Sequence, residues 1–149
     1  MAGLDPHATI MGFDFGEKRI GVAIGSLSIG VASALTTIHA ESNVDRLFAV
    51  GNLVRDWRPV QFVVGEPAYR NGEPHPIAHL AKKFGNRLTE NFKLPVAYIN
   101  EFLSSTEAAV FLAEKGIKGR NQKEKIDAVA AQIILQSWLD GQKRVSHAA

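Results

Sequence analysis

The first third of the chain carries three short apolar runs separated by turn-forming residues. The runs IMGFDF (10–15), IGVAIGS (20–26) and SALTTIHA (33–40) have the length and composition of β-strands. Their connections are short, which favours an antiparallel meander. The pattern changes at NVDRLFAVGNLVRDW (43–57), where apolar residues recur at the spacing of one helical face. A helix is therefore predicted there.

From residue 60 onward, strand-like and helix-like segments alternate. VQFVVGEP (60–67) is a continuous β-branched run, typical of a strand covered on both faces, and a polar Pro/Gly loop follows at 68–76. A helix is predicted over 77–92, a strand over 95–102 and an apolar helix over 123–139. Between them, Ser104 and Glu107 form a capping box and Gly116 follows the last turn, which predicts a helix from about 104 to 116.

This order of elements predicts an α/β fold in a single domain over 1–149. A three-strand antiparallel meander followed by strand–helix alternation favours a mixed five-stranded sheet, with the first, fourth and fifth strands parallel. Helices should cover both faces of that sheet. The ends of the chain, 1–9 and 141–149, are expected to be flexible tails.

Composition narrows the class of protein. At 149 residues, with 46% hydrophobic and 21% charged residues, the chain has the character of a soluble globular domain. The absence of cysteine excludes disulfides, thiolate nucleophiles and cysteine-ligated metals, so any metal must be held by oxygen or imidazole. The longest apolar runs, such as VAAQIIL, are far shorter than the roughly 20 residues of a membrane span. The N-terminus MAGLDPHATI does not resemble a secretory signal, so we expect a cytoplasmic protein without a membrane partner.

The distribution of charge along the chain shows one basic segment. The formal net charge of +2 is only weakly basic, but KGIKGRNQKEK (115–125) places five Lys or Arg residues in one short segment. The segment is compatible with a nucleic-acid or phosphate partner, and a solvated loop is an equally simple interpretation.

Four carboxylates stand in apolar settings, where an ionised group needs a partner. Asp14 lies near the end of the first strand, and it could simply accept backbone N–H bonds before the GEKR turn. Glu66 ends the fourth strand and could be an exposed loop residue. Glu101 ends the fifth strand, just before the helix predicted to begin near Ser104, and the positive N-terminus of that helix would favour its charge. Asp127 lies near the start of the last helix, whose N-terminus would favour it in the same way.

The four acids together suggest a different interpretation. The carboxyl ends of parallel strands meet at one edge of a sheet, so Asp14, Glu66 and Glu101 should gather there, and the last helix could bring Asp127 to them. Converging carboxylates need a cation, and hard oxygen ligands suit Mg²⁺ or Mn²⁺. Such an ion could activate water against a phosphodiester. Phosphates could be held by the segment 115–125 and by four further residues: Lys18, Arg19, Ser104 and Ser105.

Four segments in order resemble the motifs of one family. FDFGEKRIGVAIGS, VVGEP with a downstream NG, NEFLSS and KIDAVAAQIILQSWL resemble the ribonuclease H-like family of Holliday-junction resolvases, also described as nucleases that process the 5′ end of precursor small-subunit ribosomal RNA. The resemblance spans about Met11 to Leu139. It implies a ribonuclease H-like fold, metal-dependent nuclease chemistry, and Asp14, Glu101 and Asp127 as catalytic metal ligands.

The third motif departs from the family pattern D-E-R-x-[ST]-T. Asn100, Phe102 and Ser105 stand where the family usually has aspartate, arginine and threonine, while Glu101 is retained. The lost arginine would have been suited to bind phosphate or to orient a carboxylate.

Two departures lie elsewhere. Ser26 replaces an aspartate that is usual after the second strand. Glu66 replaces an apolar residue, and more distant resolvases carry an acid on their fourth strand, so Glu66 is a candidate for an extra or substitute metal ligand.

The predicted function is a divalent-metal-dependent endonuclease acting on structured nucleic acid, with processing of the 5′ end of precursor small-subunit ribosomal RNA preferred. A four-way DNA junction is the alternative substrate. A catalytically weak nucleic-acid-binding protein of the same fold is a further alternative, which the loss of arginine at Phe102 keeps open. An actin-type phosphotransferase shares the D-x-G turn but needs two lobes, for which the chain is too short. Cutting a junction symmetrically calls for two sites related by a two-fold axis. No self-complementary apolar stripe predicts a dimer, and the oligomeric state stays open.

Overall fold

The computed structural model describes residues 5–67, 77–101 and 121–148, and within these the side chains at 101, 121–125 and 143–148 lie outside the description. The elements are β1 (Ile10–Asp14), β2 (Arg19–Gly25), β3 (Ser33–His39), α1 (Asn43–Trp57), β4 (Gln61–Pro67), α2 (Ala78–Phe92), β5 (Val96–Glu101) and α4 (Asn121–Ala148).

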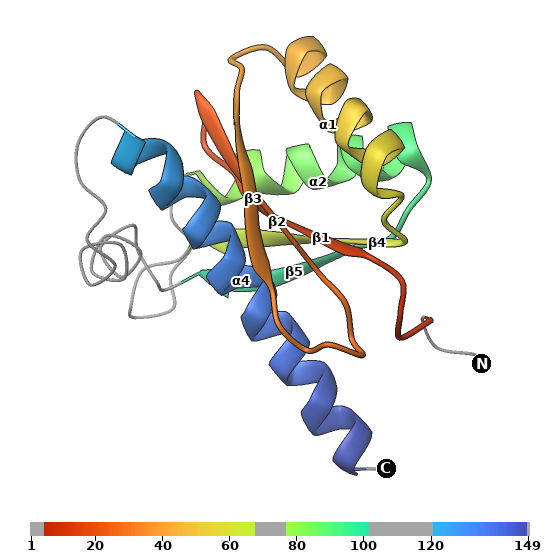
Figure 1. The fold of residues 1–149 in the computed structure, drawn as a ribbon. Coiled ribbons are helices and arrows are strands. Elements are labelled where there is room, and N and C mark those ends of the chain that lie inside the picture. The colour runs from red at the N-terminus through yellow and green to blue at the C-terminus, as the bar shows by residue number, and fades with distance from the viewer. Residues whose placement is uncertain (1–4, 68–76, 102–120, 149) are drawn as a thin grey trace.

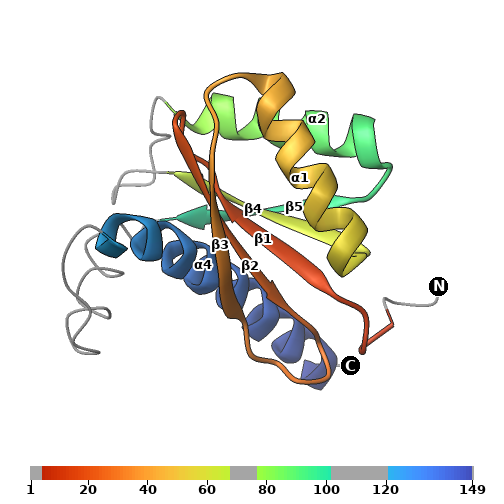
Figure 2. The same ribbon diagram turned by 45° about the horizontal axis from the view of Figure 1, so that its top comes forward.

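The strands form one five-stranded sheet in the order β3-β2-β1-β4-β5. β2 pairs antiparallel with β1 and β3, whereas β4 pairs parallel with β1 and β5. Helices α1 and α2 cover one face and α4 crosses the other (Figure 1), and the turned view separates the three layers (Figure 2). The predicted mixed sheet, with β1, β4 and β5 parallel and helices on both faces, is confirmed.

The alternation of side chains along the strands divides the core into two layers. Phe13 of β1 and Phe62 of β4 face α1 and α2, and Phe84 of α2 meets the ring of Phe13 edge-on at 5.4 Å between centroids. Ile10 of β1 belongs to the other layer, with Leu135 of α4. All except Phe84, which is 3% exposed, are fully buried. Each such side chain contributes about 1.5–3 kcal/mol to the free energy of unfolding.

Glycines on the strands let α4 lie unusually close to the sheet. A Cβ on Gly12 of β1 would stand 2.8 Å from Leu135 Cβ, and one on Gly21 of β2 would stand 1.8 Å from the Asp127 carbonyl oxygen. Asp127, Ala131 and Leu135 follow at four-residue intervals, which places them on one helical face. Ala131 and Leu135 are fully buried, so this face is the one that packs on the sheet.

Helix α4 is longer than its apolar pattern predicts. It begins at Asn121, so residues 121–125 of the expected basic loop belong to its first turns, and it continues through Ala148 across the expected tail 141–148. Gly141 costs such a helix only about 1 kcal/mol, and the Gln, Lys and Arg after it are good helix formers. The predicted helix 104–116 lies outside the described residues. Within the described residues, no helix combines the length and apolar character that a membrane span requires.

Candidate active site

Two of the predicted acids lie at the same end of the same face of the sheet. Asp14 ends β1, and it alternates with Phe13, which faces α1 and α2, so Asp14 shares the α4 face with Ile10 and Gly12. Its Cα partner on β2 is Gly21, the residue against which the backbone of Asp127 packs. Asp14 and Asp127, 113 positions apart in sequence, are thus brought together by strand pairing and helix packing.

Asp127 is held in an ion pair with a predicted phosphate-binding residue. Arg19 Nε lies 2.8 Å from Asp127 Oδ2. The Asp127 side chain is 16% exposed and that of Arg19 is 40% exposed. Oδ2 itself is buried and accepts no aligned hydrogen bond, so the contact is a pairing of charges. The carboxylate is therefore the inner partner, and the guanidinium reaches it from the rim.

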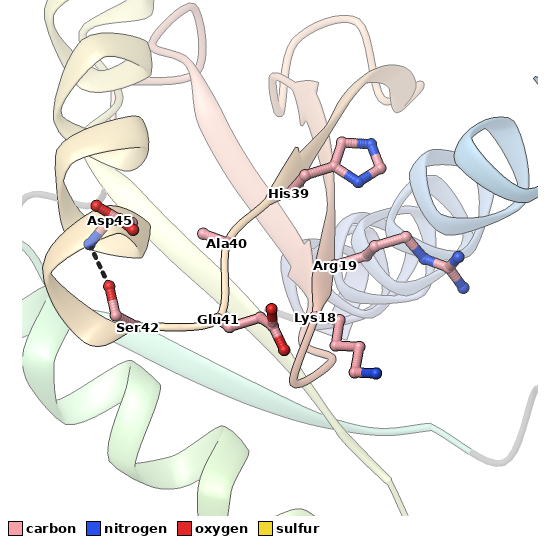
Figure 3. A pocket seen from close by; sticks show the side chains of 7 residues that line it. All are labelled: Lys18, Arg19, His39, Ala40, Glu41, Ser42 and Asp45. Carbon is pink, nitrogen blue, oxygen red and sulfur yellow. Dashed lines mark hydrogen bonds between the residues drawn. The ribbon is translucent and has the colours of Figure 1, made fainter.

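A cavity of about 630 Å³ opens beside this pair (Figure 3). Three basic side chains line it, and Arg19 and His39 extend together toward the side where α4 lies, with Lys18 beside them. Arg19 and His39 are Cα partners across β2 and β3, which explains their common direction. Glu41 and Asp45 line the cavity toward the start of α1. The basic side chains form a rim next to the Asp127 carboxylate, a suitable arrangement for a phosphodiester backbone.

Two residues of this region give no clear signal in the sequence. His39 is recognisable only through its pairing with Arg19. Arg46 of α1 packs its guanidinium 5.2 Å from the centroid of the Phe15 ring, donates to the Glu17 carbonyl and lies 3.1 Å from Asn43 Oδ1. Arg46 thereby ties α1 to the turn that carries Lys18.

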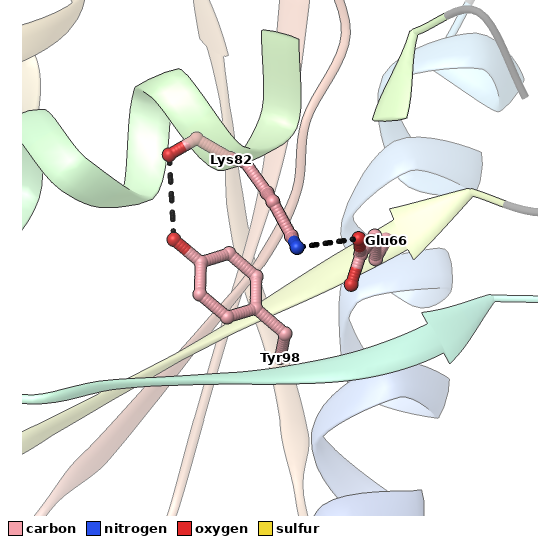
Figure 4. Close-up of polar contacts among 3 residues, drawn as sticks. All are labelled: Glu66, Lys82 and Tyr98. Atoms are coloured by element: carbon pink, nitrogen blue, oxygen red, sulfur yellow. Dashed lines mark hydrogen bonds and ion pairs between the residues drawn. The ribbon is translucent and has the colours of Figure 1, made fainter. Parts of the chain in front are cut away.

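Glu66 lies on the opposite face from Asp14. It shares the alternation of Phe62 and Val64, which pack against α1 and α2, whereas Gly65 takes the α4 side. Its carboxylate lies 3.5 Å from Lys82 Nζ of α2 and is 24% exposed (Figure 4). This register explains why Glu66, although it ends a parallel strand as predicted, is separated from Asp14 by the thickness of the sheet.

Tyr98 of β5 completes the group around Glu66. Its hydroxyl donates to the Lys82 carbonyl at 3.3 Å, and Lys82 Nζ lies 5.9 Å from the centre of its ring. Burial raises the pKa of Tyr98, and the negative charge of Glu66 raises it further. These contacts give Glu66 a structural partner, and the raised pKa means that the folded protein favours the neutral phenol of Tyr98.

The remaining predicted site residues are described less fully. Glu101 is the last residue of β5, opposite Pro67 of β4, and only its backbone is described. Ser104 and Ser105 lie outside the described residues. Among the side chains that are described, no three acids or histidines converge closely enough to hold a metal. The described part of the site thus consists of Asp14, Asp127 and their basic rim.

Comparison with solved structures identifies the fold. The chain resembles Thermus thermophilus RuvC in complex with a Holliday junction substrate, with a TM-score of 0.55 and 19% identity over 92% of this chain and 96% of that chain. It also resembles the yeast mitochondrial Holliday junction resolvase Ydc2, with a TM-score of 0.61 and 12% identity over 98% and 83% of the two chains. The predicted ribonuclease H-like fold, in the form found in these resolvases, is confirmed.

The family follows from sequence comparison. Residues 8–141 match the family model described as "RuvX: Holliday junction resolvase", and the chain belongs to this family. It is 50% identical over 137 residues to a protein of Dechloromonas aromatica, covering 92% of this chain and 94% of the relative. A relative from Neisseria gonorrhoeae is 43% identical over 136 residues, covering 91% and 90%. Both relatives carry the name "Putative pre-16S rRNA nuclease".

Proposed function

We propose that the chain is a divalent-metal-dependent endonuclease that hydrolyses phosphodiester bonds in precursor small-subunit ribosomal RNA, at its 5′ end. The observation that carries the proposal is the placing of Asp14 and Asp127 at one end of the α4 face, with Lys18 and Arg19 on the rim. Membership of the family and the name shared by relatives of about half identity support it. Such a substrate would place the protein in the cytoplasm.

The donor set fits a hard divalent ion, Mg²⁺ or Mn²⁺. Carboxylate oxygens are the ligands such ions prefer, and Asp14 and Asp127 approach from a strand end and a packed helix, which are rigid supports. Glu101 would be the third ligand, because its position continues the alternation of Ala97 and Ile99, which pack in the layer under α4. Glu66 is left out, since it faces α2 and pairs with Lys82. When bound, the ion would supply Lewis acidity and an activated water.

The chain's own residues would bind and orient the substrate. Lys18 and Arg19 carry positive charge next to the carboxylates and would bind the phosphates on either side of the scissile bond. Ser104 and Ser105, at the start of a predicted helix, would add hydroxyl and backbone N–H donors. The basic segment 115–125 would extend the contact along the backbone, which makes binding sensitive to salt.

A four-way DNA junction is the second candidate substrate, because the family model is described as a resolvase and one structural neighbour was solved on a Holliday junction. Symmetric junction cleavage requires two sites related by a two-fold axis, whereas trimming one RNA strand requires one site. The oligomeric state at working concentration therefore separates the two substrates.

The deciding experiment compares cleavage of a 5′-extended ribosomal RNA precursor, an unstructured RNA and a four-way DNA junction, each with Mg²⁺, Mn²⁺ or chelator. Asp14→Asn is run beside Asp56→Asn, the same chemical change at an exposed residue of α1. We expect cleavage of the precursor that needs both metal and Asp14 and is unaffected at Asp56. Binding without any such cleavage would reject the nuclease and support a binding protein of the same fold.

A further inference from the structure

The ion pair between Arg19 and Asp127 occupies the carboxylate that the proposed metal would need. Asp127 cannot turn away easily, because its backbone is pressed onto Gly21 and its side chain is largely buried. Arg19 differs in this respect: it begins β2, its side chain is 40% exposed, and it lines the open cavity with Lys18 and His39. Asp127 is therefore held in position by packing, whereas the Arg19 side chain has room to adopt a second conformation in the cavity.

The pair has the energetics of an exchangeable contact. A partly exposed ion pair is weak, on the order of 1 kcal/mol or less, because water screens it and the arginine loses rotamer freedom. Arg19 Nε and Asp127 Oδ2 are 2.8 Å apart without an aligned hydrogen bond, so the contact lacks the strength of a fork-shaped arginine–carboxylate pair. A divalent ion carries twice the charge and would compete effectively for the same oxygen.

We propose that Arg19 is an exchangeable counter-ion of the active site. In the metal-free protein it neutralises Asp127; when a divalent ion takes this carboxylate, the guanidinium swings into the cavity beside Lys18 and binds a substrate phosphate. This inference rests on the proposed nuclease function, and it adds to that function a coupling between metal and substrate.

The coupling follows from linkage. If the ion and Arg19 compete for Asp127, then binding of the ion makes Arg19 available to phosphate, and a phosphate on Arg19 makes Asp127 available to the ion. Each ligand then raises the affinity for the other. Lys18 cannot serve this purpose, since no contact joins it to Asp127 in the described part of the chain. It provides a control one residue away with the same formal charge.

The test measures Mn²⁺ affinity by calorimetry, without nucleic acid, for the wild type, Arg19→Met and Lys18→Met. Arg19→Met keeps a side chain of similar length and removes the competitor, so we expect Mn²⁺ to bind about three- to tenfold more tightly, the range of a modest pair coupling. Lys18→Met removes the same charge and should change affinity by less than about twofold, because an exposed charge at the rim is screened. Equal effects of the two variants, or weaker binding by Arg19→Met, would overturn the proposal.

Two further measurements localise the effect. In an Asp127→Asn background, Arg19→Met should no longer tighten Mn²⁺ binding; an undiminished gain would mean a general field effect and would reject the exchange. In NMR spectra, the chemical shift of the Arg19 Nε–Hε group should change, and its proton should exchange faster with water, as Mg²⁺ reaches saturation. A signal that stays in place at saturation would show that Arg19 remains on Asp127, against the proposal.

Folding is checked for each variant by circular dichroism. If Arg19→Met does not fold, Arg19→Lys, which keeps the charge but loses the planar guanidinium, should give an intermediate Mn²⁺ affinity, and an affinity equal to that of the wild type would count against the proposal. Failure of the nuclease function itself is a separate result, because it appears as absent cleavage by the wild type in the presence of metal.

Discussion

Gly21→Ala tests how the closeness of α4 to the sheet positions the site. Gly21 does not need its conformational freedom, since Gly30 is the one glycine with positive φ in the described residues. What Gly21 provides is room: an added Cβ would stand 1.8 Å from the carbonyl oxygen of Asp127, 2.3 Å from its carbonyl carbon and 3.0 Å from the Ala128 nitrogen. All three atoms are backbone, so no side-chain rotation can relieve the clash.

The size of the effect can be worked out from these distances. Carbon–oxygen contacts normally begin at about 3.3 Å, so the helix backbone at Asp127 must retreat by about 1.5 Å. Overpacking of this kind lowers the free energy of unfolding by about 1–3 kcal/mol, and the backbone clash favours the upper end. A misplacement of about 1 Å can reduce a reaction rate about a hundredfold. Because Asp127 sits at the clash, we expect the loss of cleavage to exceed what the loss of stability explains.

The assay combines urea unfolding with single-turnover cleavage of the precursor RNA at a temperature where the variant remains folded. Gly141→Ala is the matched control, because it lies in the same helix and an added Cβ meets nothing within 4 Å. In a helix this substitution should stabilise by up to about 1 kcal/mol and leave cleavage unchanged. A Gly21→Ala protein with wild-type stability and wild-type rate would refute the close packing of α4 on β2 and the positioning of Asp127 that depends on it.

Four shorter predictions accompany it. Glu66→Gln should retain metal-dependent cleavage in the same assay, because Glu66 faces α2; a loss as large as that of Asp14→Asn would contradict this placement. Asp127→Asn should abolish cleavage while changing the urea-unfolding free energy by less than about 1 kcal/mol, since it removes a partly exposed pair. The burial-raised pKa of Tyr98 means that the fold favours the neutral phenol, so its contribution to stability is complete below pH about 10 and is lost as the pH rises through the raised pKa. In a Tyr69→Phe background Tyr98 is the one remaining tyrosine, its ultraviolet titration should lie above pH 10, and adding Glu66→Gln should lower it. Phe13→Ala, at a fully buried site, should cost about 3–5 kcal/mol in urea unfolding, and a cost below 1 kcal/mol would contradict the core assignment.

Most strands and helices could be predicted, because they depend on apolar spacing and turn residues that are close together in sequence. Short apolar runs bounded by turn residues and helical spacing identified the five strands and the helices α1 and α2 to within one or two residues. The C-terminus of α4 was missed, because the apolar face ends near Leu139 while the backbone continues to Ala148. The last turns consist of residues with good helix propensity but have no apolar face, so hydrophobic spacing could not predict them.

The sequence by itself determined the mixed α/β class, the acids set into apolar elements, and the order of motifs that marks the family. It could not determine which face each acid occupies. A strand reverses its side chains at every residue, so the single step from Gly65 to Glu66 separates a position on the face of Asp14 from a partner of Lys82 on the opposite face. The sequence also could not determine that Arg19 forms an ion pair with Asp127. That contact requires β2 to pair with β1 and the backbone of α4 to pack against Gly21. Both depend on register and packing between residues distant in sequence, and only the tertiary structure specifies these.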